Sequence, residues 1–168
     1  PSQLKKVKGL GYCVDGLPIL TPPERVVPHE RMDVDLPGTA SDLHPYDSRP
    51  LDLYRSHFWH SNFNHALRIP FAAIYTSLGC RFQCSFCMIN IINRTNNDEN
   101  ISSQNSNTFR WWSPEFIIKQ FDYIAKQGVK NVKIADELFV LNPTHFMKIC
   151  YLLIERNYGF NIWAYSRI

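Results

Sequence analysis

The sequence predicts an α/β fold: a partial (βα) barrel with about three parallel strands and two crossover helices, preceded by an irregular N-terminal lead-in. Two helices begin with a capping residue followed by proline, and apolar, strand-like runs stand before, between and after them. Nine of the eleven prolines lie at or before Pro70, which indicates irregular structure there. The order strand, helix, strand, helix, strand is typical of a parallel sheet. We therefore divide the chain into a lead-in, residues 1–70, and a barrel portion, residues 71–168.

The lead-in has one local signal of regular structure. Residues 9–15 and 17–21 predict a β-hairpin with an Asp-Gly turn between them. The rest shows no sustained periodicity. Five of the six histidines lie in this part, and three stand close together without a carboxylate at ligand spacing: His57, His60 and His65. We expect these three to be solvated or packed on aromatic rings rather than to bind a metal.

The first strand and helix of the barrel portion have clear boundaries. Residues 71–78 form an apolar, β-rich run that stops at Gly79, as a buried strand leading into a loop does. Ser113 and Pro114 are typical of the N-cap and first position of a helix, and Gly128 is typical of its end. Between this strand and this helix, residues 90–107 are rich in asparagine and serine and predict a polar surface loop.

The second half of the barrel portion repeats this pattern. Residues 131–135 and 138–141 predict one strand, interrupted by two acidic residues. Asn142 and Pro143 start the second helix as a cap and proline pair, and residues 160–165 predict the third strand.

Composition excludes several classes of protein. A chain of 168 residues with 45% hydrophobic content is long enough for a domain with a core. No apolar run approaches the ~20 residues that span a bilayer. The net charge of +3 is small, and the basic residues are scattered rather than clustered as in a nucleic-acid binder. Reactive cysteines favour a reducing compartment, so we expect a cytoplasmic protein.

The strongest chemical signal is a CxxxCxxC motif at Cys80, Cys84 and Cys87. Three thiolates on one tight loop suit a metal centre, and three cysteines cannot pair off as internal disulfides. A four-iron cluster held by three cysteines has one iron without a protein thiolate, where another molecule can bind. The alternatives are a zinc site, which normally has four ligands, and plain packing of small apolar thiols.

The motif, with Phe86 just before its last cysteine and an apolar strand before it, resembles the cluster loop of the radical S-adenosylmethionine (radical SAM) superfamily. The resemblance implies a 4Fe-4S cluster on Cys80, Cys84 and Cys87, with S-adenosylmethionine bound at the fourth iron. It implies an enzyme that reductively cleaves S-adenosylmethionine to a 5'-deoxyadenosyl radical and receives electrons from a donor such as flavodoxin or ferredoxin. The substrate and the reaction class, oxidoreductase or methyltransferase, stay open.

Other site residues are expected where the strands end, because the carboxyl ends of parallel strands share one rim. By the resemblance, Asp136 or Glu137 would contact the amino group of S-adenosylmethionine, and Arg167 its carboxylate. Phe86 would pack beside the cluster, where backbone reaches the adenine. The alternatives are an ordinary strand-end carboxylate that caps a helix or meets Lys133, and a solvated arginine.

Two further expectations concern what lies around this chain. The lead-in, with the segment 109–143, is similar to the cobalamin-dependent radical SAM subgroup, which implies possible cobalamin use in a longer protein. A full barrel of this kind takes ~250 residues, so we expect this chain to be incomplete and inactive alone, with a missing continuation or a partner chain. The competing hypothesis is a non-catalytic iron-sulfur or zinc-binding module that acts as a partner subunit.

Overall fold

The computed structural model describes residues 3–22, 24, 26–44, 54–92 and 109–167. It is a mixed α/β structure with a three-stranded parallel sheet of order β3-β6-β7. The strands are β1 Gly11–Val14, β2 Leu17–Leu20, β3 Phe71–Ile74, β4 Ser77–Leu78, β5 Arg110–Trp111, β6 Asn131–Ile134 and β7 Asn161–Ala164. The α-helices are α1 Met32–Asp35, α2 Ile89–Ile92, α3 Pro114–Lys126 and α4 Pro143–Arg156. The 3-10 helices are η1 Leu4–Lys6, η2 His29–Arg31, η3 Ser41–Leu43, η5 Phe58–Ser61, η6 His65–Leu67 and η8 Phe139–Leu141.

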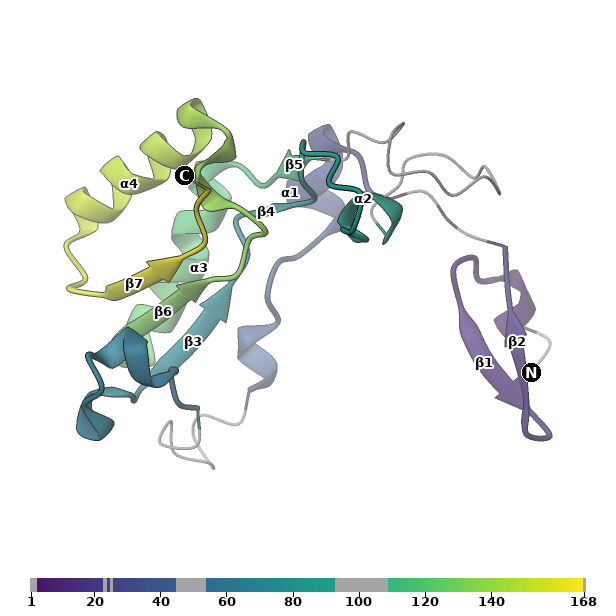
Figure 1. Cartoon of the computed structure of the whole chain (residues 1–168), viewed down its shortest axis with the longest axis horizontal. Helices are drawn as coiled ribbons and strands as arrows, with labels where there is room; N and C mark the ends of the chain where they lie inside the picture. The colour runs from purple at the N-terminus through teal and green to yellow at the C-terminus, as the bar shows by residue number, and fades with distance from the viewer. Residues whose placement is uncertain (1–2, 23, 25, 45–53, 93–108, 168) are drawn as a thin grey trace.

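Helices α3 and α4 cover one face of the parallel sheet (Figure 1). Alternate residues of β3 and β6 point to that face, and Ile74, Val132 and Ile134 are buried against Phe121 of α3 and Ile149 of α4. This core has the predicted strand and helix order. The three parallel strands are compatible with the predicted partial (βα) barrel, which stays a prediction.

Both long helices begin as the sequence predicts. The Ser113 side chain accepts a hydrogen bond from the backbone N–H of Phe116, and the Asn142 side chain accepts one from His145. The α3 helix stops before Gly128, which has a φ of +79°, and α4 ends at Asn157 in the left-handed region. Local capping therefore fixes these helix boundaries.

The second predicted strand is partly wrong. Strand β6 stops at Ile134, and the apolar residues 139–141 form the 3-10 helix η8 rather than continuing the strand. The carboxylate of Asp136 is buried and accepts hydrogen bonds from Thr76, which follows β3. To reach Thr76, the backbone after β6 leaves the sheet. The first strand also divides, since β3 ends at Ile74 and the short strand β4 pairs antiparallel with β5.

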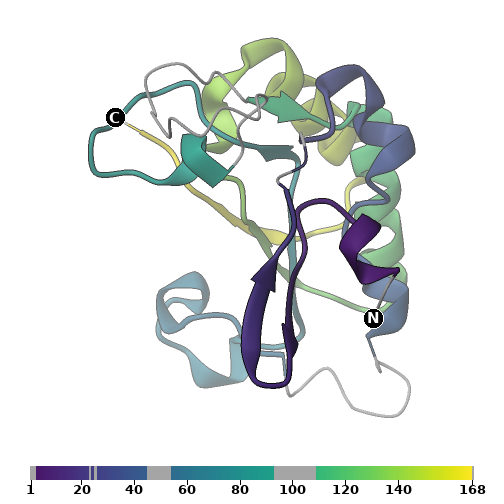
Figure 2. The same ribbon diagram turned by 90° about the vertical axis from the view of Figure 1, so that its right-hand side faces the viewer.

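The lead-in is irregular but contributes to the core. Met32 of α1 is only 1% exposed and belongs to the core cluster, and the indole N–H of Trp112 donates to the carbonyl of Leu36. The predicted hairpin is present as β1 and β2, and Figure 1 shows it standing apart from the parallel sheet. In Figure 2 the hairpin faces the viewer, in front of the rest of the chain. Most of the asparagine-rich segment, residues 93–107, lies outside the described residues.

No helix in the part of the chain that the structure describes is long and apolar enough to cross a membrane.

Candidate functional site

The carboxyl ends of the three parallel strands border a cavity of about 990 Å³. Its walls are the cysteine loop, residues 79–88, the short helix α2, the turn after β6 and the segment after β7. All seven residues that the sequence analysis placed at the site line this cavity: Cys80, Cys84, Phe86, Cys87, Asp136, Glu137 and Arg167. They come from positions up to 87 residues apart in the chain, so the fold rather than the sequence brings them together.

The three cysteines are free thiols on one loop. Cys80 is buried, whereas Cys84 and Cys87 are partly exposed, and the N–H of Cys87 donates to the carbonyl of Cys84 over 3.0 Å. Burial raises the pKa of the Cys80 thiol, the N–H of Phe82 opposes this effect, and the neighbouring Cys84 and Cys87 raise the pKa further. These thiols therefore lie close enough to influence one another.

No three His, Cys, Asp or Glu side chains among the described residues are grouped as ligands of a single metal ion. A four-iron cluster makes a different demand, because each thiolate binds its own iron and the three sulfurs stand at separate corners. What the loop offers is three soft donors on one face of a cavity, and this donor set fits iron-sulfur chemistry.

Asp136 is fully buried, with 0% exposure, and both its oxygens are engaged. Oδ1 accepts from the backbone N–H of Thr76 over 2.6 Å, and Oδ2 accepts from the hydroxyls of Thr76 and Ser77 over 2.5 Å and 2.7 Å. Three hydrogen bonds satisfy this carboxylate inside the protein. Asp136 thus joins the ends of β3 and β6 and shapes the cavity wall.

Glu137, the next residue, has a different environment. Its Oε2 is buried and has no hydrogen-bond partner among the residues that the structure describes. Burial raises the pKa of Glu137, and Asp136 raises it further, whereas hydrogen bonds from the backbone of Glu137 and Gly79 and the charge of Arg110 lower it. A buried carboxylate oxygen without a donor at the edge of a cavity is a ready partner for a cationic group such as an ammonium.

Arg110 is the neighbouring residue that sequence reasoning did not place at the site. It is buried in β5, burial lowers its pKa, and the charge of Glu137 opposes that effect. Its position depends on the pairing of Leu78 with Arg110 across β4 and β5. In the sequence, Arg110 stands directly before two tryptophans.

Phe86 and Arg167 lie on the outer side of the cavity. Phe86 is 89% exposed, although it lines the cavity. The guanidinium of Arg167 lies 4.3 Å from the centre of the Phe82 ring, a cation–π contact between the segment after β7 and the cysteine loop. Arg167 is therefore positioned over the loop by an aromatic ring.

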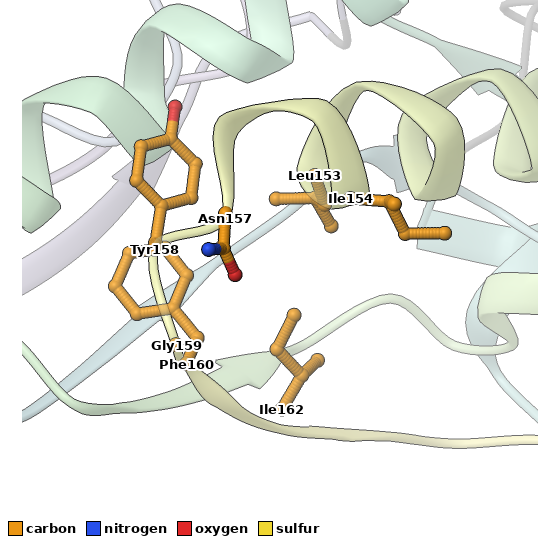
Figure 3. A pocket seen from close by; sticks show the side chains of 7 residues that line it. All are labelled: Leu153, Ile154, Asn157, Tyr158, Gly159, Phe160 and Ile162. Carbon is orange, nitrogen blue, oxygen red and sulfur yellow. The ribbon is translucent and has the colours of Figure 1, made fainter.

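A smaller cavity of about 180 Å³ lies between the end of α4 and β7 (Figure 3). Leu153, Ile154 and Ile162 supply apolar walls, and Figure 3 shows the Tyr158 hydroxyl directed away from the cavity. That hydroxyl donates to Asp122 of α3. With Asn157 as its polar side chain, this cavity offers no acid, base or nucleophile.

The fold and the cavity define a mixed α/β protein with a thiol-bearing site at the carboxyl ends of a parallel sheet. The sequence is similar to a protein named uncharacterized methyltransferase PH0819, of Pyrococcus horikoshii, with 25% identity over 167 residues. The similarity covers 99% of this chain but 30% of that protein, so the chain spans about a third of the relative's length. No protein-family model matches the sequence. No solved structure matches it either.

Proposed function

We propose that this chain is the cluster-binding part of a radical SAM enzyme, with a 4Fe-4S cluster on Cys80, Cys84 and Cys87. The observation that carries the proposal is the single cavity at the strand ends, which these three thiols share with an unsatisfied carboxylate oxygen of Glu137. When bound, the reduced cluster supplies the electron that cleaves the sulfonium bond of S-adenosylmethionine.

The residues of the chain have distinct roles in this proposal. Glu137 Oε2 accepts a hydrogen bond from the amino group of S-adenosylmethionine, because this oxygen is buried at the cavity and has no donor among the described residues. Arg167 binds the carboxylate of the same molecule, and Phe86 shields the site from water. Asp136 is bonded to Thr76 and Ser77, so its part is to hold the turn that carries Glu137.

The similarity to a protein named as a methyltransferase supports methyl transfer as the reaction class of the proposed enzyme. Cobalamin use and a flavodoxin or ferredoxin partner stay predictions from the resemblance.

Anaerobic reconstitution tests the proposal. The chain should bind about four irons, and the electron paramagnetic resonance spectrum of its reduced cluster should change when S-adenosylmethionine is added. Replacing Cys80, Cys84 and Cys87 together by alanine should abolish iron binding. The matched control is Cys13→Ala, which removes an exposed thiol of the hairpin.

Full iron content in the triple variant would contradict the proposal. A cluster whose spectrum does not change when S-adenosylmethionine is added, or zinc bound in place of iron, would instead favour the non-catalytic binding module.

A further inference from the structure

The face of the parallel sheet opposite α3 and α4, which we call the open face, carries a cation that no described carboxylate pairs with. In register across the sheet, this face presents Ala73 of β3, Lys133 of β6 and Trp163 of β7. Lys133 Nζ lies 5.1 Å from the ring centre of Trp163 and 5.1 Å from that of Tyr165. None of the ion pairs between described residues includes Lys133.

Aromatic rings stabilise an ammonium through their negative faces but leave its hydrogen-bond donors unused. An ammonium that lies beside two rings, with no carboxylate among the described residues, is therefore positioned for an external acceptor. A second polar group near Lys133 supports the same conclusion. His60 Nε2 is buried and has no hydrogen-bond partner among the described residues, and the centre of the His60 ring lies 4.2 Å from that of Trp163. Burial lowers the pKa of His60, and the charges of His57 and Lys133 lower it further.

The open face leads directly to the candidate site. Tyr165, whose ring contacts the Lys133 ammonium, also lines the large cavity, together with Tyr75 and Ala135. Both tyrosines are about half exposed, at 45% and 46%. A molecule in the cavity can therefore stack on these rings while an anionic end reaches Lys133.

The opposite end of the open face is covered by the lead-in. The Asn131 side chain donates to the carbonyl of Leu67 over 2.8 Å, and the Asn161 side chain donates to that of His60. The layer that contains Lys133 thus lies between this covered end and the cavity.

From this arrangement we propose that the open face binds the anionic end of the substrate, with Lys133 as the anion-recognition residue. The substrate class is a flat, conjugated ring that carries a carboxylate or a phosphate. The inference rests on the proposed function only in naming the bound molecule as the substrate. Trp163 and Tyr165 hold the ammonium, and His60 Nε2 offers a second polar contact.

The test uses small probes that differ in charge but share a shape. The full chain, metal-free and reconstituted, is titrated by NMR with 2-naphthoate, 2-naphthyl phosphate and the neutral 2-naphthamide. We expect both anions to bind about tenfold more tightly than the amide, the size of effect that one charge-assisted hydrogen bond gives. Equal or tighter binding of the carboxylate, despite the larger charge of the phosphate, identifies carboxylate as the natural group, and clearly tighter binding of the phosphate favours phosphate.

Three variants locate the effect. Lys133→Met keeps the apolar stem, and it should remove the preference for anions, whereas Lys133→Arg should retain it. The control is Lys130→Met, which removes an exposed ammonium three residues earlier on the chain. Urea unfolding of each variant shows whether the fold is intact.

An anion preference that survives in Lys133→Met, or equal binding of the amide and the anions, would overturn the inference. Because the metal-free chain suffices, this failure is distinct from failure of the proposed function, which is judged by iron content and the response to S-adenosylmethionine.

Discussion

The two acidic neighbours Asp136 and Glu137 lie in opposite situations at the same turn. Asp136 has no exposure and accepts three hydrogen bonds from Thr76 and Ser77. Glu137 has a buried oxygen with no donor. One carboxylate therefore builds the cavity, and the other is left for a ligand. A pair of adjacent acids in a sequence thus need not share a role, and burial with its partners decides which residue is structural.

The largest effect should come from removing the structural member of the pair. Asp136→Ala leaves the donors of Thr76 and Ser77 without their acceptor, and we expect the free energy of unfolding to fall by more than about 3 kcal/mol. Equilibrium unfolding in urea measures it. Glu137→Ala is the matched control and should cost well under half as much. Equal losses in the two variants would remove the distinction between them.

A milder substitution, at the hydrogen-bond donor Thr76, tests the same structural role of Asp136. Thr76→Val preserves shape and the backbone N–H, but it removes the hydroxyl that donates to Asp136 Oδ2. We expect a loss of about 1.5–3 kcal/mol, the range for hydrogen bonds to charged groups. In a double-mutant cycle with Asp136→Ala the two losses should be strongly non-additive. Additive losses would show that Thr76 acts independently of Asp136.

His145, at the start of α4, supplies a pH-dependent test near the same turn. It is buried, its Nε2 lies 3.0 Å from the carbonyl of Trp112, and burial lowers its pKa, while Asp136 partly opposes this. Below pH ~6.5 the unfolded chain binds a proton that the folded His145 resists. Stability should therefore fall as pH drops below that value, by at most about 1.4 kcal/mol per pH unit from this group. His145→Gln should flatten that part of the urea-midpoint profile, and an unchanged slope would contradict the assignment.

The smallest effect is expected on the ligand side of the cavity. Phe86 is 89% exposed, so Phe86→Ser should change the unfolding free energy of the metal-free chain by less than about 0.5 kcal/mol. The same variant should speed oxygen damage to a reconstituted cluster, followed by loss of visible absorbance. A large loss of stability would mean that Phe86 packs against the fold rather than covering the site.

Local sequence signals predicted the local structure well. Ser113 and Asn142 cap their helices because capping depends on residues three positions away, within the reach of a motif. The hydrogen bond that Thr76 donates to Asp136 joins residues 60 positions apart, and no local pattern encodes it. The same holds for Met32, an isolated apolar residue in the lead-in that the structure buries in the core.

Contacts across residue 70 are likewise beyond the reach of a local pattern. The sequence marks residue 70 by the end of a proline-rich segment, but Asn131 and Asn161 donate hydrogen bonds to the lead-in carbonyls of Leu67 and His60. At the site, spacing predicted the shared rim of Cys80, Glu137 and Arg167, because parallel topology places strand ends together. It did not reveal the buried Arg110, whose place depends on a two-residue antiparallel pairing.

The contacts of Trp163 have an experimental consequence. Its indole contacts the imidazole of His60 and the ammonium of Lys133, and the Tyr165 ring lies 4.5 Å away. Indole emission responds to charge brought near the ring, so this residue is a natural fluorophore for the uncovered side of the sheet. Since the chain has four tryptophans, replacing the other three by phenylalanine leaves a single emitter. Occupancy beside Lys133 then becomes an optical signal that needs no label, no metal and no turnover.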